Sequence, residues 1–139
     1  MLRDSATSYL VHPSGYSAQP SCPPLLRIEF APNYTKVDFG YQTKPFYIRG
    51  GWVRIHRDTF LRDRATGRRY PMTRAEGIPV GPERLDFNTP KDWLYFSLYF
   101  PPIPFRDQDL DLIEQEPGDA NDFNYFNINI IAKEAMRIK

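Results

Sequence analysis

The sequence is poor in the residues that build catalytic and metal centres. Its 139 residues include one cysteine, Cys22, and two histidines, His12 and His56. A lone cysteine cannot form an internal disulfide, and zinc sites need several cysteines or histidines at short spacing. A serine nucleophile motif, a glycine-rich phosphate loop and a nucleotide-binding fingerprint are also missing. We therefore expect no enzyme activity, no transition metal and no cofactor.

Long apolar runs and a strong charge of one sign are missing as well. No segment approaches the roughly 18 apolar residues of a membrane span. The opening segment, residues 1–24, has no apolar core of the kind found in an intact signal peptide. The formal net charge is only +1, whereas nucleic-acid-binding domains are usually basic overall. We therefore expect no membrane span, and the charge argues against nucleic acid as a partner.

What the sequence does contain is a repeated alternation of apolar and polar residues, the pattern of half-buried β-strands. Prolines fall where these strands should stop, and no long window has helical spacing without proline or glycine. The pattern predicts an all-β domain of seven or eight strands in two antiparallel sheets, with a small β-barrel as the alternative. The positions expected to face the core are Leu26, Ile28, Phe30, Val37, Phe39, Tyr41, Val53, Ile55, Leu94, Phe96, Leu98, Phe100, Leu110, Leu112, Phe126, Ile128 and Ile130.

Three segments follow from this pattern. Residues 1–24, rich in proline, serine and glycine, are expected to be a flexible lead-in. Residues 25–131 form the sandwich domain, in which Gly67 supplies a tight hairpin turn and Gly77–Pro90 is an ordered surface loop. Residues 132–139 are either the first turns of a helix or a linker.

Charge is unevenly distributed along the chain. Residues 49–74 contain eight arginines and two aspartates, whereas residues 107–122 contain seven acidic residues and no basic one. Such segments can pair with each other or steer a protein partner. The candidate partner-binding residues are Arg62, Arg64, Arg68 and Arg69. Calcium takes six to eight oxygen ligands, so Asp107, Asp109 and Asp111 are weak calcium candidates, although they could equally be the solvent face of a strand.

Aromatic residues supply a second candidate site. Because Leu94, Phe96, Leu98 and Phe100 occupy one face of their strand, Trp93, Tyr95 and Tyr99 should occupy the other. Residues two apart on a strand are separated by roughly 7 Å, a spacing on which sugar rings can stack. The alternative is that both faces of this strand are covered.

His56 and Asp58 are a third candidate site. Both are expected on one face of a strand that also carries Trp52 and Arg54, and a histidine beside an aspartate can act as a general base. The alternative is an outward polar face without catalytic function.

Several short strings together resemble a known family. They are Gly50-Gly51-Trp52-Val53-Arg54-Ile55, Thr66-Gly67-Arg68-Arg69-Tyr70, Gly77-Ile78-Pro79, Phe100-Pro101-Pro102-Ile103-Pro104, Asp111-Leu112-Ile113-Glu114 and Phe123-Asn124. In this order they resemble an uncharacterised β-sandwich module of exported proteins from Bacteroidetes, over roughly Leu25 to Ile131. The resemblance implies an immunoglobulin-like sandwich and a cell-envelope or extracellular location. It carries over no catalytic residue.

Three functional hypotheses result. The first is a non-catalytic interaction or accessory module that binds another protein in an envelope assembly. The second is a carbohydrate-binding module that uses Trp93, Tyr95 and Tyr99. The third is a small hydrolase-like enzyme centred on His56 and Asp58.

Overall fold

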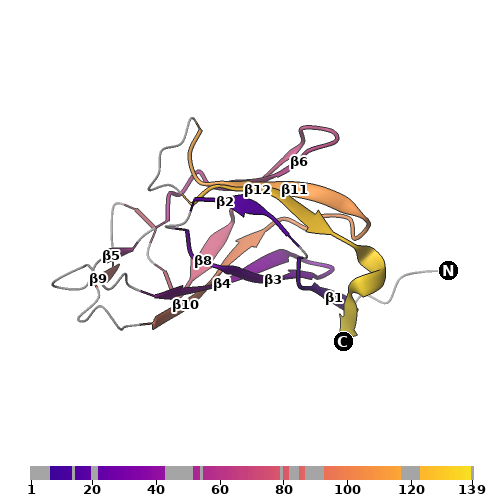
Figure 1. Cartoon of the computed structure of the whole chain (residues 1–139), viewed down its shortest axis with the longest axis horizontal. Helices are drawn as coiled ribbons and strands as arrows, with labels where there is room; N and C mark the ends of the chain where they lie inside the picture. Colours follow the sequence, from indigo (N-terminus) through magenta and orange to yellow (C-terminus); the bar gives the residue numbers. More distant parts are fainter. Residues whose placement is uncertain are drawn as a thin grey trace.

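The protein is an antiparallel β-sandwich, seen in a computed structural model of the whole chain (Figure 1). The structure describes residues 7–13, 15–19, 22–42, 52–53, 55–78, 80–81, 85–86, 93–116 and 123–138. Within those residues the one helical element is a short 3-10 turn, η1 (Ala132–Glu134). The sequence-based prediction of an all-β fold is therefore confirmed.

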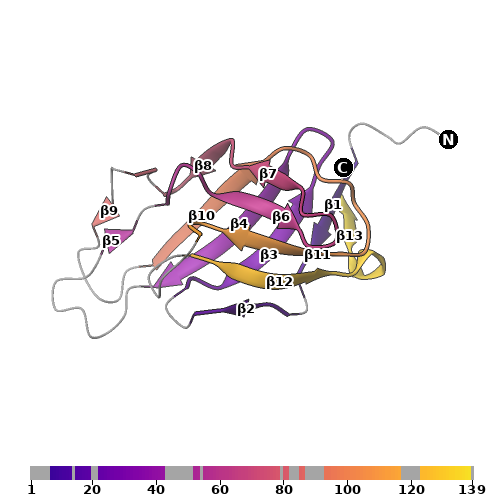
Figure 2. The ribbon, with the colours of Figure 1, turned by 90° about the horizontal axis from the view of Figure 1, so that it is seen from above.

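Two sheets face each other, and their strands cross at an angle when seen from above (Figure 2). The six-stranded sheet has the order β13 (Met136–Ile138), β1 (Ser8–Val11), β3 (Leu25–Phe30), β4 (Thr35–Gln42), β10 (Trp93–Phe100) and β8 (Arg74–Glu76). The five-stranded sheet has the order β2 (Ser17–Ala18), β12 (Tyr125–Ile130), β11 (Gln108–Ile113), β6 (Phe60–Asp63) and β7 (Arg69–Pro71). A separate ribbon pairs β5 (Trp52–Val53) with β9 (Leu85–Asp86).

Eight of these strands have the connectivity of an immunoglobulin-like sandwich. One sheet contains β3-β4-β10-β8 in the order of strands A, B, E and D, and the other contains β12-β11-β6-β7 in the order of G, F, C and C′. The two large sheets are separate and do not close on each other, so the described strands do not form the alternative, a small closed barrel.

The core lies between the sheets and follows the alternation seen in the sequence. Ile28, Val37 and Leu98 project from one sheet, Leu61 and Leu110 project from the other, and all five side chains are buried. The hairpin between β6 and β7 turns at Gly67, whose φ of 78° is the left-handed value that glycine tolerates best. The side chains of Tyr41, Val53 and Leu94, expected in the core, lie outside the described residues.

Two irregularities shift the alternation by one residue. In β3 the pairing with β4 changes register between Leu25 and Arg27, so Leu25 is buried and Leu26 is 41% exposed. In β12 the left-handed residue Asn127 (φ 56°) accompanies a register shift that buries Tyr125 and leaves Phe126 exposed. The prediction that Leu26 and Phe126 face the core is therefore wrong, because an extra residue in one strand reverses the side-chain direction beyond it.

The two ends also differ from the expectation. Strands β1 and β2 lie within the predicted flexible lead-in, and β1 pairs with β3. Tyr9 of β1 stacks on Phe105 with ring centroids 4.2 Å apart. At the other end, η1 carries the chain from β12 across to β13, which pairs with β1 (Figure 1). The tail is thus neither a continuing helix nor an unpaired linker. The predicted surface loop Gly77–Pro90 is described in part, and its described residues include a short strand, β9.

A buried tyrosine ties the lead-in to the sandwich and gives a first test. The Tyr125 hydroxyl donates a hydrogen bond to the carbonyl oxygen of Pro23 at 2.5 Å. Tyr125→Phe keeps the ring but leaves this carbonyl without its donor, so we expect about 1 kcal/mol less unfolding free energy in urea titrations. An unchanged unfolding free energy would contradict a stabilising role for this bond.

The buried Tyr125 hydroxyl should also make the protein less stable at alkaline pH. Burial raises the pKa of Tyr125 well above its ordinary value of 10.0, and the nearby Cys22 and Tyr16 add to the rise. The folded protein keeps this proton while the unfolded chain releases it above about pH 10, so this contribution to stability is present below pH 10 and declines above it. Tyr125→Phe should remove this part of the pH dependence.

Candidate functional site

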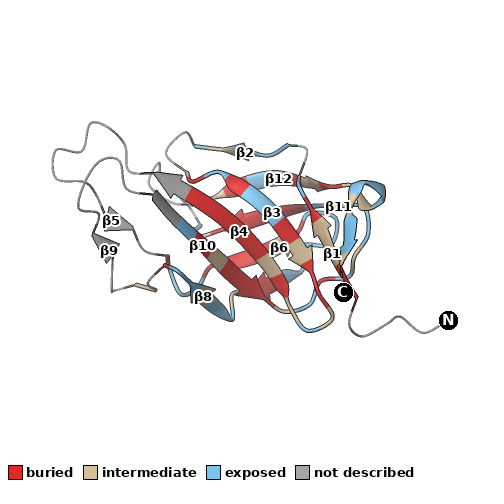
Figure 3. Ribbon diagram, turned by 90° about the horizontal axis from the view of Figure 1, so that it is seen from below, coloured by how far each residue is buried: buried red, intermediate tan, exposed pale blue. Residues whose placement is uncertain are grey.

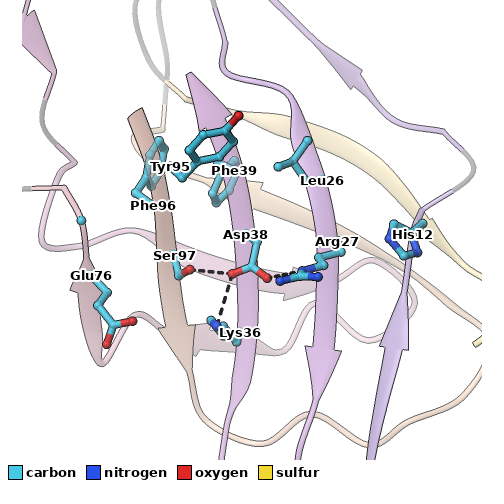
Figure 4. Close-up of a pocket in the computed structure, with 11 residues that line it drawn as sticks. His12, Leu26, Arg27, Lys36, Asp38, Phe39, Glu76, Tyr95, Phe96 and Ser97 are labelled. Atoms are coloured by element: carbon cyan, nitrogen blue, oxygen red, sulfur yellow. Dashed lines mark hydrogen bonds and ion pairs between the residues drawn. The ribbon is translucent and has the colours of Figure 1, made fainter. Parts of the chain in front are cut away.

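A shallow groove of about 710 Å³ runs across the outward face of the six-stranded sheet. Seen from below, this face shows β4 between β3 and β10 (Figure 3). Figure 4 shows the residues that line the groove. They are His12, Leu26, Arg27, Lys36, Asp38, Phe39, Glu76, Gly77, Tyr95, Phe96 and Ser97.

An apolar row crosses three strands within the groove. Tyr95 of β10 pairs directly with Gly40 of β4. A Cβ atom at Gly40 would lie 3.3 Å from Cε1 of Tyr95 and 3.5 Å from Cδ1 of Leu26. The tyrosine and leucine therefore approach each other over the glycine, which leaves room for them because it has no side chain. Tyr95 is nevertheless 68% exposed.

A polar row lies beside the apolar one, centred on Asp38. Ser97 donates a hydrogen bond to Asp38 Oδ1 at 2.5 Å, and Arg27 Nε donates to Asp38 Oδ2 at 2.7 Å. Lys36 Nζ lies 3.6 Å from Oδ1 (Figure 4). The carboxylate side chain is only 12% exposed. Two hydrogen bonds and one ion pair therefore fix its orientation, and the row presents donors and acceptors in a set geometry.

The three aromatic residues predicted to share this face have different surroundings. Tyr95 lines the groove, whereas Tyr99 is 8% exposed. The Arg74 guanidinium lies 3.9 Å from the Tyr99 ring centroid, and the Tyr99 hydroxyl donates to Glu76. Tyr99 is thus on the outward face but covered. The side chain of Trp93 lies outside the described residues.

Sequence reasoning did not find the rest of the groove. The alternation in the sequence places Leu26 in the core, because no local signal marks the bulge that turns it outward. The polar residues Arg27 and Asp38 alternate with core residues and could be placed on the outward face from the sequence. Their position next to Ser97 could not, because it depends on the register of β3, β4 and β10.

The arginine segment and the acidic segment pair with each other on the five-stranded sheet. Arg62 and Asp111 are direct cross-strand partners, with Nη2 and Oδ2 3.0 Å apart. Arg64 Nη1 lies 2.9 Å from Asp111 Oδ1, and Glu116 contacts both Arg62 and Arg69. Much of the charge that was expected to attract a partner is therefore used inside the fold.

Asp111 is the centre of this network and is only 1% exposed. Burial alone would raise the pKa of its carboxyl group. Hydrogen bonds from Arg64, from the backbone N–H of Asn127 and from Arg62 outweigh this effect, so the pKa lies below its ordinary value of 3.8. The ionised form is the one that the fold stabilises. Arg68, the remaining candidate in this segment, lies over the ring of Tyr70.

The three calcium candidates do not converge on one point. Asp111 is held by arginines, Asp107 Oδ1 accepts a hydrogen bond from the Ala132 backbone, and Asp109 Oδ1 accepts one from Asn129. Across the described residues, no three histidine, cysteine or acidic side chains gather as they would around a metal ion.

His56 and Asp58 occupy a turn rather than a strand face. Thr59 N donates to the carbonyl oxygen of His56, and Asp58 N donates to His56 Nδ1 at 3.0 Å. The two side chains are 45% and 82% exposed and 3.8 Å apart. The predicted alignment of both residues along one strand is therefore wrong, because the chain reverses between them. Trp52 belongs to β5, and Arg54 lies outside the described residues.

Comparison with known proteins adds no assignment. No family model, curated protein or solved structure matches this chain significantly. In the part of the chain that the structure describes, no helix has the length and hydropathy of a membrane span.

Proposed function

We propose that this protein is a non-catalytic binding module and that its recognition surface is the groove across β3, β4 and β10. The observation that carries the proposal is the exposure of Tyr95, at 68%, beside a row of preorganised polar groups. Tyrosine is favoured at binding surfaces because it combines an apolar ring with a polar tip. Groups that are already oriented lose little entropy on binding.

The arginine segment is a weaker candidate for the recognition surface. Arg62 and Arg64 are engaged with the buried carboxylate of Asp111. Reversing their charge would damage the fold as well as any partner contact, so such a variant could not identify an interface. The resemblance to exported modules supports a cell-envelope location for the proposed module.

A hydrolase-like function has less geometric support. His56 Nδ1 accepts a backbone hydrogen bond within its own turn, and the Asp58 side chain is largely exposed. A general base works within hydrogen-bond reach of a bound substrate, and neither His56 nor Asp58 lines the groove.

NMR mapping tests the location of the recognition surface. We expect cocktails of neutral, cationic, anionic and apolar fragments to shift the backbone amides of Gly40 and Ser97. Tyr95→Ala should remove these shifts, because the exposed ring supplies most of the apolar contact. Arg69→Glu, on the other sheet, should leave them unchanged. Shifts that cluster around Arg69 instead would overturn the proposed surface.

A further inference from the structure

We infer that the groove binds a neutral oligosaccharide, with one sugar ring stacked on Tyr95. This inference rests on the proposed function and names the ligand class for the same surface. Three properties of the groove support it: an apolar platform, a polar row at the right distance, and a balance of charge.

The platform is the Tyr95 ring, held against the sheet over Gly40 and next to Leu26. The ring is exposed, and it lies over Gly40 of the neighbouring strand with the Leu26 side chain on the other side of that glycine. The C–H face of a sugar ring is apolar, so stacking on an aromatic ring removes apolar surface from water on both sides.

The polar row lies two residues further along the same strands. Tyr95 and Gly40 pair in one row, and Ser97 and Asp38 pair in the next. Rows two residues apart are separated by roughly 7 Å, so a ring stacked on Tyr95 directs hydroxyl groups toward Asp38 and Arg27. A sugar hydroxyl both donates and accepts, and this row offers a carboxylate acceptor beside a guanidinium donor.

The charges that line the groove cancel. Arg27 and Lys36 supply two formal positive charges, and Asp38 and Glu76 supply two negative ones. Asp38 is paired with both Arg27 and Lys36. An anionic ligand would be expected to select a surplus of arginine or lysine. The balance therefore favours a ligand without net charge.

Hydrogen bonding within the sheet argues against a peptide added as a further strand. Such a peptide pairs with a free sheet edge. The groove is centred on β4, which is paired on both sides, with β3 and with β10. The outer sides of β3 and β10 are paired over Ile28–Phe30 with β1 and over Ser97–Tyr99 with β8. Recognition at this face must therefore use side chains, as in the binding of sugars to an aromatic platform.

The test is an NMR titration of the full chain with defined oligosaccharides. The neutral probes are cellotetraose, laminaritetraose, xylotetraose and mannotetraose, the anionic probe is tetragalacturonate, and a mixture of neutral octapeptides is the protein-like probe. With one stacking residue we expect a Kd on the order of 1 mM for the best neutral probe. Tyr95→Ala should weaken the affinity for this probe about tenfold, and Tyr95→Phe should retain most of the affinity because the ring is kept.

Phe126→Ala is the matched control, because Phe126 is an exposed aromatic residue on the five-stranded sheet. It should leave the affinity unchanged. Saturable shifts at Gly40 and Ser97 with a neutral oligosaccharide, with an affinity about tenfold weaker in Tyr95→Ala, support the inference. Groove shifts caused only by tetragalacturonate or by the peptides overturn the neutral-sugar assignment and leave the proposed surface intact. A complete lack of groove shifts, with binding elsewhere or none, overturns both.

Discussion

Asp111→Asn is expected to lower the unfolding free energy by about 3 kcal/mol. The change removes a charge that is 1% exposed and held by Arg62, Arg64 and the Asn127 backbone. Arg64 then loses the carboxylate that it pairs with, Arg62 keeps only its pairing with Glu116, and the new amide N–H points toward groups that only donate. Breaking a buried pair on one side costs about 3–5 kcal/mol, and the partial exposure of the two arginines places this case at the lower limit.

The pH dependence gives this prediction a second readout. Because the pKa of Asp111 is lowered in the folded state, its stabilising contribution is present above the ordinary pKa of 3.8 and is lost as pH falls through the folded value. The stability curves of wild type and Asp111→Asn should therefore differ at neutral pH and converge in acid. Chemical denaturation at several pH values measures both curves, and parallel curves would contradict the assignment.

Asp109→Asn is the matched control on the same strand. Asp109 is exposed, and its Oδ1 accepts one hydrogen bond from Asn129 at the surface. We expect a change within about 0.5 kcal/mol, as is usual for surface substitutions. An equal loss in both variants would show that the acidic character of β11, rather than the buried pair, determines stability.

The contrast between these two aspartates shows how far the sequence can be interpreted. The alternation of β11 correctly places Leu110 and Leu112 in the core and both aspartates on the outward face. It cannot show that Asp111 is buried there, because the covering residues Arg62 and Arg64 lie far away in sequence and reach it through the pairing of β6 with β11.

The register shifts in β3 and β12 are a second feature that could not be predicted from the sequence. A strand period of two is a local signal, and it succeeds for Ile28, Val37 and Leu98. It fails at Leu26 and Phe126, where one additional residue shifts the pairing and turns the following side chain to the opposite face. The groove depends on the first of these shifts, so the fold could be predicted from alternation while part of the site could not.

The lead-in shows the same dependence on long-range pairing. Ser8–Val11 is short and carries a weak strand signal. It becomes a strand because β3 and β13 lie on its two sides, and β13 comes from the opposite end of the chain. A composition rich in proline and serine predicts a flexible segment when the segment is considered alone. Pairing with the edge of the sheet stabilises the strand conformation instead.

Gly77→Ala should destabilise the protein by about 3 kcal/mol and disturb the groove at the same time. Gly77 has φ 82°, a conformation that costs an alanine about 1–2 kcal/mol. In addition, its Cβ would lie 2.7 Å from the backbone oxygen of Tyr95 and 3.2 Å from Cα of Phe96. These are backbone atoms, so β8 must move away from β10, which adds about 1–3 kcal/mol.

Gly67→Ala separates the two causes of destabilisation, the backbone strain at positive φ and the steric clash with β10. Gly67 has a nearly identical φ of 78°, but a Cβ there meets nothing within 4 Å. It should cost only the conformational strain, about 1–2 kcal/mol. The difference between the two variants, measured by urea denaturation, is the cost of the steric contact between a Cβ at Gly77 and the backbone of β10.

The same pair of variants connects stability with recognition. Glu76 pairs with Ser97 in the register of β8 and β10, and both residues line the groove. Displacement of β8 in Gly77→Ala should therefore shift the amides of Phe96 and Ser97 and weaken oligosaccharide binding. Gly67→Ala should leave both unchanged, because the β6–β7 hairpin lies in the other sheet. Equal losses of stability in the two variants, with an undisturbed groove, would mean that close packing of β8 against β10 does not shape this surface.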